Sequence, residues 1–235
     1  ATPDLTSFSA TVPPAAFARA LAFLADRMPG NAVTASDLAA ERAALKAERT
    51  RSDRPPVARA LARLWAMAWP GHPYAKTGAE PSLGADAITP ADVDAWRRAR
   101  ISVSSATLTM AGAFDPASAL AAIRERFESE PRVAAPAVPG AIVPRVAGRS
   151  IDRVEIPVRL CLVGWRGPGA GDPDAPALEF LAAWLGGGPQ ARLSRSLVSD
   201  WHLAAAAQAA FTAQKDGSLL WVLLVVPPGA DSAAV

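Results

Sequence analysis

The sequence is poor in several residue types on which common functional sites depend. It has one cysteine, two histidines and one tyrosine, and lysine occurs only at positions 46, 76 and 215. A single cysteine excludes a disulfide framework within the chain and a cysteine-based zinc site. Because Cys161 lies in the apolar, strand-like stretch "VRLCLVGW", we expect it to be a small core residue.

Long apolar runs and clusters of like charge are also scarce. The longest apolar run, "LLWVLLVV" at 219–226, is far shorter than the roughly 18 residues of a transmembrane helix, so we interpret it as a buried strand. The formal net charge is only +2, and the arginines are scattered rather than clustered with aromatic residues. We therefore expect a globular protein with no nucleic-acid partner and no membrane span.

Helical periodicity and helix-start signals occur throughout the first half of the chain. Thr89 followed by Pro90 and Asp92 predicts an N-cap with a capping-box acid, and Asp115-Pro116 predicts a second helix start of the same kind. Thr34 or Ser36 is expected to cap an earlier helix that ends or kinks at the proline pair 55–56. The predicted helices cover residues 13–28, 34–54, 57–69, 88–100 and 117–127.

The remaining pattern predicts an α+β fold made of antiparallel sheets covered by helices on one face. Strands are expected at 5–12, 105–114, 153–165 and in two segments ending at Val226, with helices at about 174–185 and 190–200. The proline-rich stretch 131–150 has no periodicity and is predicted to be a linker. It would separate the C-terminal part of a first domain, 1–130, from the N-terminal part of a second, 151–235.

A short internal sequence repeat supports two partial domains. A strand-like segment followed by Val-Pro-Pro and an alanine-rich stretch occurs near residue 13 and again 214 residues later. The chain would then begin inside one domain and stop inside the next. We expect the exposed sheet edges to be covered, either because the two halves close on each other or because a homodimer forms.

Glu41 and Glu48 are the most conspicuous candidates for a chemical role. They lie seven residues apart on a predicted helix, so both carboxylates share one face, about 10 Å apart. Leu38 and Leu45 lie on the same stripe, and we expect that stripe to face the core. Two explanations remain open: a solvated helix edge on which Arg51 pairs with Glu48, or a site in which a metal or a catalytic group compensates the carboxylates.

A resemblance to a known family bears on this choice. The stretches "AVTASDLAAERAALKAERTRSDRPP", "WAMAWPGHPYAKTG", "ITPADVDAWRRARISVSSATLTMAGAF" and "DPDAPALEFLAAWLGGGPQARLSRSL" resemble the insulinase/pitrilysin family of zinc peptidases. In that family a His-x-x-Glu-His helix supplies two zinc ligands and the general base, and a downstream glutamate is the third ligand. The resemblance implies that Glu48 is this metal ligand and that Glu41 is the catalytic, acidic helper two turns before it.

The sequence departs from the family pattern in two ways. It contains no His-x-x-Glu-His, and its two histidines, His72 and His202, are expected to be loop or packing residues. The family's second domain typically offers an arginine and, seven residues later, a tyrosine to the substrate, but the matching positions here are Val198 and Ala205. The resemblance therefore implies zinc in the parent protein, with none expected on this fragment.

Three functions follow as hypotheses. The first is a part of a zinc-dependent metalloendopeptidase that cleaves peptides and is inactive by itself, with a second peptidase-family subunit or a second copy as partner. The second is a non-catalytic partner or scaffold subunit of the same family, and the third is an unrelated α+β interaction module. The arginine and alanine bias together with the bacterial-type resemblance suggests the periplasm.

Other motifs are interpreted as structural. Gly186-Gly187-Gly188 lacks the following Gly-Lys-Ser/Thr of a phosphate loop, so we expect a helix C-cap and turn. The serines that follow it have no Gly-x-Ser-x-Gly setting, which argues against a serine hydrolase.

Overall fold

The computed structural model describes residues 2–27, 32–52, 55–76, 86–129, 132, 147–151 and 156–229. These residues divide into two compact units that are each discontinuous in sequence. Unit 1 comprises residues 1–5, 48–81 and 140–235, and unit 2 comprises residues 6–47 and 82–139. The predicted linker 131–150 lies almost wholly outside the described residues, so the boundaries of the two family domains remain a prediction.

Unit 1 is built around an antiparallel sheet of three strands. The strands are β1 (Arg159–Gly167), β2 (Ala206–Ala213) and β3 (Ser218–Val226), in the order β1-β3-β2. The central strand β3 is the "LLWVLLVV" run, and Leu219, Leu223 and Leu224 are all buried. The sequence prediction of a buried strand is confirmed.

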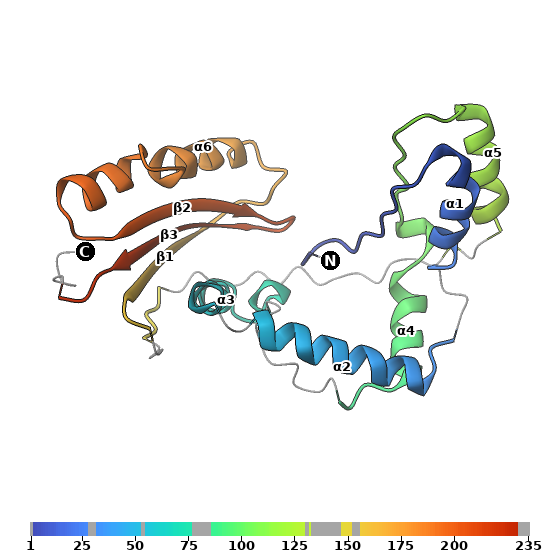
Figure 1. Cartoon of the computed structure of the whole chain (residues 1–235), viewed down its shortest axis with the longest axis horizontal. Coiled ribbons are helices and arrows are strands. Elements are labelled where there is room, and N and C mark those ends of the chain that lie inside the picture. The colour runs from blue at the N-terminus through green and yellow to red at the C-terminus, as the bar shows by residue number, and fades with distance from the viewer. Residues whose placement is uncertain are drawn as a thin grey trace. The chain divides into compact units, whose positions relative to one another are not determined.

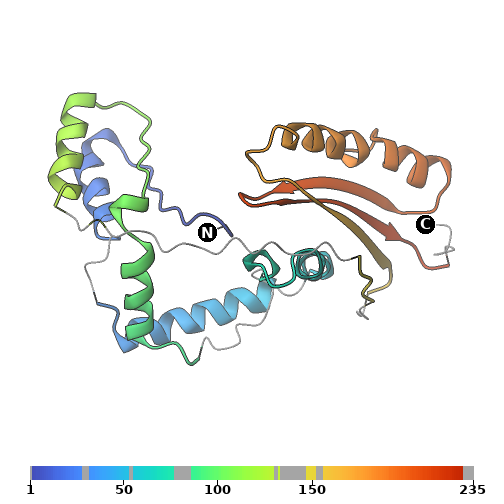
Figure 2. The same cartoon turned by 180° about the vertical axis from the view of Figure 1, so that it is seen from behind.

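Helices cover both faces of this sheet, not one as predicted. The helix α6 (Ala175–Gly186) and the π-helix η4 (Ser194–Asp200) cover the face that carries Ala207, Leu224 and Val226. The helix α3 (Pro56–Ala68) covers the opposite face, and the figures show α6 and α3 on the two sides of the strands (Figures 1 and 2). The pattern of a single sequence cannot show that α3 covers this face, because α3 precedes β1 by about a hundred residues.

The core on the α3 face consists mainly of aromatic side chains. Trp65, Trp69, Tyr74 and Leu219 form one buried cluster, against which Trp221 packs. Trp65 and Tyr74 meet edge to face with ring centroids 6.1 Å apart, and Trp69 meets Tyr74 similarly at 5.7 Å. Such pairs add roughly 0.5–1.5 kcal/mol beyond the burial of their area.

From Cys161 to Trp165 the edge strand β1 is covered on one face only. Gly164 packs against Leu64 of α3, whereas Val163 and Trp165, which point to the other face, are 43% and 52% exposed. Cys161 shares that open face and is exposed, so the prediction that it is a core residue is wrong. The reason is that α6 and η4 lie over β2 and β3, while β1 is left open on that side.

Unit 2 is helical within the described residues. It contains α1 (Phe17–Ala25), most of α2 (Ala35–Ser52), α4 (Pro90–Arg100) and α5 (Pro116–Phe127), with the short 3₁₀ helices η1 (Pro14–Ala16) and η3 (Val103–Ser105). Its α1 packs on α5, where Leu21 and Ala119 are buried. Arg42 of α2 donates hydrogen bonds to the backbone oxygens of Asp86 and Ile88 just before α4.

The predicted strands at 5–12 and 105–114 are not formed, and this part of the prediction is wrong. Neither segment is paired with any described strand, and residues 103–105 form η3 instead. Apolar residues in both segments are exposed, including Phe8 at 48% and Leu108 at 42%. An extended segment becomes a strand only when a partner satisfies its backbone groups, and these two find none within the described part of the chain.

Helix starts follow the predicted local chemistry. Thr89 Oγ1 accepts a hydrogen bond from the Asp92 N–H at 3.2 Å, and Asp92 Oδ2 accepts one from the Thr89 N–H at 2.8 Å, which completes the capping box. Asp115 Oδ2 likewise accepts from the Ser118 N–H at 2.8 Å. Hydrogen bonds from Thr89 and Ser118 respectively hold the pKa values of the Asp92 and Asp115 carboxyls below their ordinary value.

Candidate functional site

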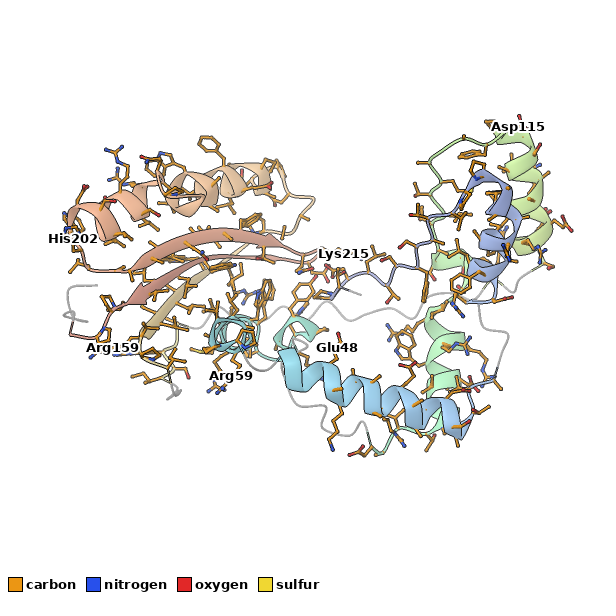
Figure 3. All side chains as sticks on the ribbon, viewed as in Figure 1. Glu48, Arg59, Asp115, Arg159, His202 and Lys215 are labelled. Carbon is orange, nitrogen blue, oxygen red and sulfur yellow. The ribbon has the colours of Figure 1, made fainter. Side chains whose placement is uncertain are left out.

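The two candidate carboxylates lie on one continuous helix. α2 begins beside Thr34, whose hydroxyl accepts a hydrogen bond from the Asp37 N–H at 3.2 Å, and it runs unbroken past Glu48 to Ser52. Glu41 and Glu48 are therefore two turns apart on the same face, with Glu48 toward the C-terminal end of α2 (Figure 3). Both side chains are exposed, and neither forms an ion pair with any described side chain.

The apolar neighbours of these carboxylates are less buried than expected. Leu38 is half-buried, but Leu45 is 40% exposed, so the expectation that this stripe faces the core is wrong at Leu45. α2 carries charged or polar residues over most of its circumference and has only these two leucines, which is too narrow a stripe to bury. The exposed carboxylates therefore need no internal partner in this chain.

His72 has a structural role. It is 5% exposed, and its Nδ1 accepts a hydrogen bond from the Tyr74 N–H at 3.2 Å. Its ring lies 5.2 Å from that of Trp69 and 4.3 Å from that of Tyr74. His72 caps the short helix η2 (Pro73–Ala75) and packs in the aromatic core, as the sequence prediction of a loop or packing histidine stated.

Tyr74 joins three segments of unit 1. Its hydroxyl donates to Asp4 Oδ1 at 2.6 Å and accepts from the Asp216 N–H at 3.0 Å, while Asp4 Oδ2 accepts from the Lys215 N–H at 2.8 Å. Burial of the phenol, with the hydrogen bond to Asp4, raises the pKa of Tyr74 to about 12. The group therefore stays protonated and is suited to a structural role.

The residues that the structure describes do not come together as a zinc site. His202 is exposed and keeps its Nδ1 2.9 Å from the Val198 backbone oxygen, with a positive φ of 53°. Among the described residues no group of three histidine, cysteine, aspartate or glutamate side chains could hold a metal ion. Glu48 offers one carboxylate, whereas a catalytic zinc site takes three protein ligands, so the donors in the described part of the chain do not fit the metal.

The positions that the resemblance assigns to a substrate-binding arginine and tyrosine have other roles here. Val198 packs against the buried cluster of Ala207, Leu224 and Val226. Ala205 is exposed, and its backbone N–H donates to the Val225 oxygen at 2.7 Å. Neither side chain has a polar group that could hold a peptide.

The glycine run ends a helix, as predicted, and Ser194 after it has a structural role. Gly187 is the C-cap of α6, and its N–H donates to the Ala183 oxygen at 2.8 Å. A Cβ on Gly186 would lie 2.1 Å from the Ala209 backbone nitrogen, so this glycine allows α6 to approach β2 closely. Ser194 is buried, and its hydroxyl donates to the Ala207 oxygen at 3.2 Å.

One groove was not predicted from the sequence. It has a volume of about 700 Å³ and is lined by the C-terminal end of α6, the glycine turn and residues of η4. Its polar and aromatic lining includes Trp184, Gln190, Arg192, Arg195 and Asp200. The signal that could have indicated it is the spacing of two arginines, three residues apart, directly after a glycine turn.

Comparison with known proteins identifies the fold and the family. A protease from Helicobacter pylori superimposes with a TM-score of 0.76 and 18% sequence identity, over 95% of this chain and 55% of that one. A peptidase M16 inactive domain from Pseudomonas fluorescens has a TM-score of 0.69 and 20% sequence identity, over 88% of this chain and 51% of that one. A chain of complex III from Candida albicans has a TM-score of 0.65 and 14% sequence identity, over 89% of this chain and 51% of that one.

The chain therefore spans about half the length of the solved structures that it matches. No curated protein matches it. None of the helices in the described ranges is long and apolar enough to cross a membrane. The resemblance to insulinase-type peptidases and the predicted α+β fold are confirmed, because the family model described as "Peptidase M16 inactive domain" matches residues 87–234. Since this match covers well over half of the sequence, the chain belongs to the peptidase M16 family.

Proposed function

We propose that this chain is part of a zinc-dependent metalloendopeptidase of the M16 family and has no peptidase activity by itself. Zinc would be held in the parent protein, with Glu48 as one ligand and with a His-x-x-Glu-His helix from residues outside this sequence. The observation that carries the proposal is the placement of Glu41 and Glu48 on one face of α2, both exposed and without an ion-pair partner among the described side chains. Bound there, zinc would supply Lewis-acid activation of water for peptide hydrolysis.

The test is made in the full-length parent protein. Glu48→Gln is expected to abolish stoichiometric zinc and peptide hydrolysis, because a neutral amide is a poor zinc ligand. Glu41→Gln is expected to keep the metal and to lower the rate, and the matched control Glu125→Gln, on the exposed side of α5, is expected to match the wild type. Full zinc content and full activity in the Glu48→Gln protein would contradict the proposal.

A second candidate is a non-catalytic partner subunit of the same family. It is favoured by the fold shared with a chain of complex III. The absence of the arginine and tyrosine, at Val198 and Ala205, instead fits the first candidate, a zinc-carrying subunit whose partner supplies that pair. A parent protein that binds zinc but hydrolyses peptides only after a second family subunit is added would support the first candidate. A parent without zinc, with or without that subunit, would support the second.

The partner and the compartment belong to the same proposal. We expect a peptide substrate, a second family subunit or a second copy of this chain as partner, and a periplasmic location. Light scattering of the purified chain distinguishes a homodimer from a monomer. Membership of the M16 family leaves no place for the third hypothesis, an unrelated interaction module.

A further inference from the structure

The turn between α3 and η2 holds a buried histidine whose hydrogen bond depends on its protonation state. His72 is 5% exposed, and its Nδ1 accepts a hydrogen bond from the Tyr74 N–H at 3.2 Å. A neutral imidazole has one acceptor nitrogen, whereas a protonated imidazole has two N–H donors and no acceptor. Protonation would therefore place a donor against the Tyr74 N–H and remove the cap of η2.

The same turn fastens the first residues of the chain. The Tyr74 hydroxyl donates to Asp4 Oδ1 at 2.6 Å and accepts from the Asp216 N–H at 3.0 Å. The other carboxylate oxygen of Asp4 accepts from the Lys215 N–H at 2.8 Å. All three hydrogen bonds pass through the Tyr74 hydroxyl or through the carboxylate that it holds, so a displacement of Tyr74 would weaken them together.

The surroundings of His72 combine aromatic rings with an excess of cations. The Trp69 indole lies 5.2 Å from the imidazole and also carries the Arg166 guanidinium 3.9 Å from its centroid. The Asp4 carboxylate is already bound by Tyr74 and by the Lys215 N–H. The charged side chains on the segments packed around the turn are Asp4, Arg59, Arg63, Lys76, Arg159, Arg166, Lys215 and Asp216.

We propose that the His72 turn is an acid-sensitive switch, in which protonation of the imidazole displaces Tyr74 and releases residues 2–5 from the β2–β3 turn. Histidine is the side chain whose charge ordinarily changes between pH 5 and 8. The released turn binds the proton and the closed turn does not, so the closed form is favoured at neutral pH and is lost as the pH falls. The switch uses no residue of the proposed zinc site, so it is independent of the peptidase proposal.

The experiment is amide hydrogen exchange of the complete 235-residue chain, followed by NMR at pH 7 and pH 5 and corrected for the intrinsic pH dependence of exchange. We expect the Tyr74, Lys215 and Asp216 amides to lose protection by about tenfold or more at pH 5, because their acceptors are withdrawn. The central strand β3 should stay protected, since the release is local.

Two histidine variants separate the imidazole from the rest of the fold. In His72→Asn the side-chain oxygen can replace Nδ1 as the acceptor and the cap, and it does not titrate, so the three amides should stay protected at pH 5. The matched control is His202→Asn, which replaces an exposed histidine at a positive φ that asparagine tolerates (Figure 3). This control should respond to acid as the wild type does.

A second measurement does not depend on the folding of His72→Asn. The His202→Asn protein retains His72 as its only histidine, so a single imidazole resonance reports the titration of that ring. Its midpoint should coincide with the midpoint of the amide release.

Unchanged protection at pH 5 would overturn the inference, as would acid release that persists in a folded His72→Asn protein. Two midpoints more than about one pH unit apart, or a loss of protection that starts only below pH ~4, would assign the release to groups other than the imidazole and overturn it. Loss of protection throughout β3 at pH 5 would indicate global unfolding and would overturn it as well.

Discussion

The packing of Trp69 against the β2–β3 turn predicts a strong effect of Gly217→Ala. A Cβ at Gly217 would lie 2.0 Å from Cη2 and 2.3 Å from Cζ2 of the Trp69 ring. The ring cannot move aside easily, since it is 5% exposed, packs on Tyr74 and carries the Arg166 guanidinium 3.9 Å from its centroid. Overpacking of this kind destabilises by roughly 1–3 kcal/mol.

The assay is urea unfolding of the purified chain, with Gly171→Ala as the matched control. A Cβ at Gly171 meets no atom within 4 Å, so that substitution should be neutral or stabilise by about 0.4–1 kcal/mol. Trp69→Leu removes the colliding ring atoms and should cost somewhat less than the ~3–5 kcal/mol of a tryptophan-to-alanine change.

A double-mutant cycle completes the test. In the Trp69→Leu protein the cost of Gly217→Ala should vanish, which gives a coupling free energy of about 1–3 kcal/mol. If Gly217→Ala is as harmless as Gly171→Ala in the wild-type background, the indole does not lie over this turn. The packing of α3 and Trp69 on this face of the sheet in unit 1 would then be wrong.

Further predictions concern hydrogen bonds and pH. Tyr74→Phe should lower the free energy of unfolding by roughly 1–3 kcal/mol, because it leaves the Asp216 N–H and the Asp4 carboxylate without their partner. Because the pKa of Tyr74 is raised to about 12, its protonated form stabilises the fold below pH ~10, and this stabilisation is lost between about pH 10 and 12 in the wild type but not in the phenylalanine variant. Thr89→Ala should destabilise α4 by about 1 kcal/mol, measured by thermal unfolding. Because the pKa values of Asp92 and Asp115 are lowered in the folded state, both carboxylates stabilise the fold above their ordinary pKa of 3.8. This stabilisation is lost as the pH falls through the lower folded pKa values. Asp92→Asn should therefore remove part of the acid dependence of the free energy of unfolding.

Local features were predictable because a few neighbouring residues determine them. The starts of α4 and α5 were identified from Thr89-Pro90 and Asp115-Pro116, and the glycine turn after α6 was identified from its three glycines. The central strand β3 was identified from an uninterrupted apolar run, because a short run of this kind is typical of a fully buried strand.

Nonlocal features were not predictable from one sequence. The segments 5–12 and 105–114 have strand composition but no partner within the described residues, and strand propensity reflects packing more than backbone preference. The exposure of Cys161 depends on how far α6 extends over β1. The groove between α6 and η4 requires two segments to meet, although its arginines are only three positions apart in the sequence.

The candidate site was predictable only as a pattern on one helix. The spacing of Glu41 and Glu48 correctly placed them on one face of α2, and the metal proposed to bind there stays a prediction. The roles of Val198 and Ala205 became clear only when η4 and β2 were seen to pack together.

The most direct test of the central claim is the zinc stoichiometry of the 235-residue chain, measured by equilibrium dialysis against micromolar zinc. In the proposed site Glu48 would be one of three protein ligands, so we expect far less than one equivalent of bound zinc and no change on Glu48→Gln. One equivalent of zinc per chain, lost on Glu48→Gln and kept in the Glu125→Gln control, would contradict the claim that the site is completed from outside this sequence.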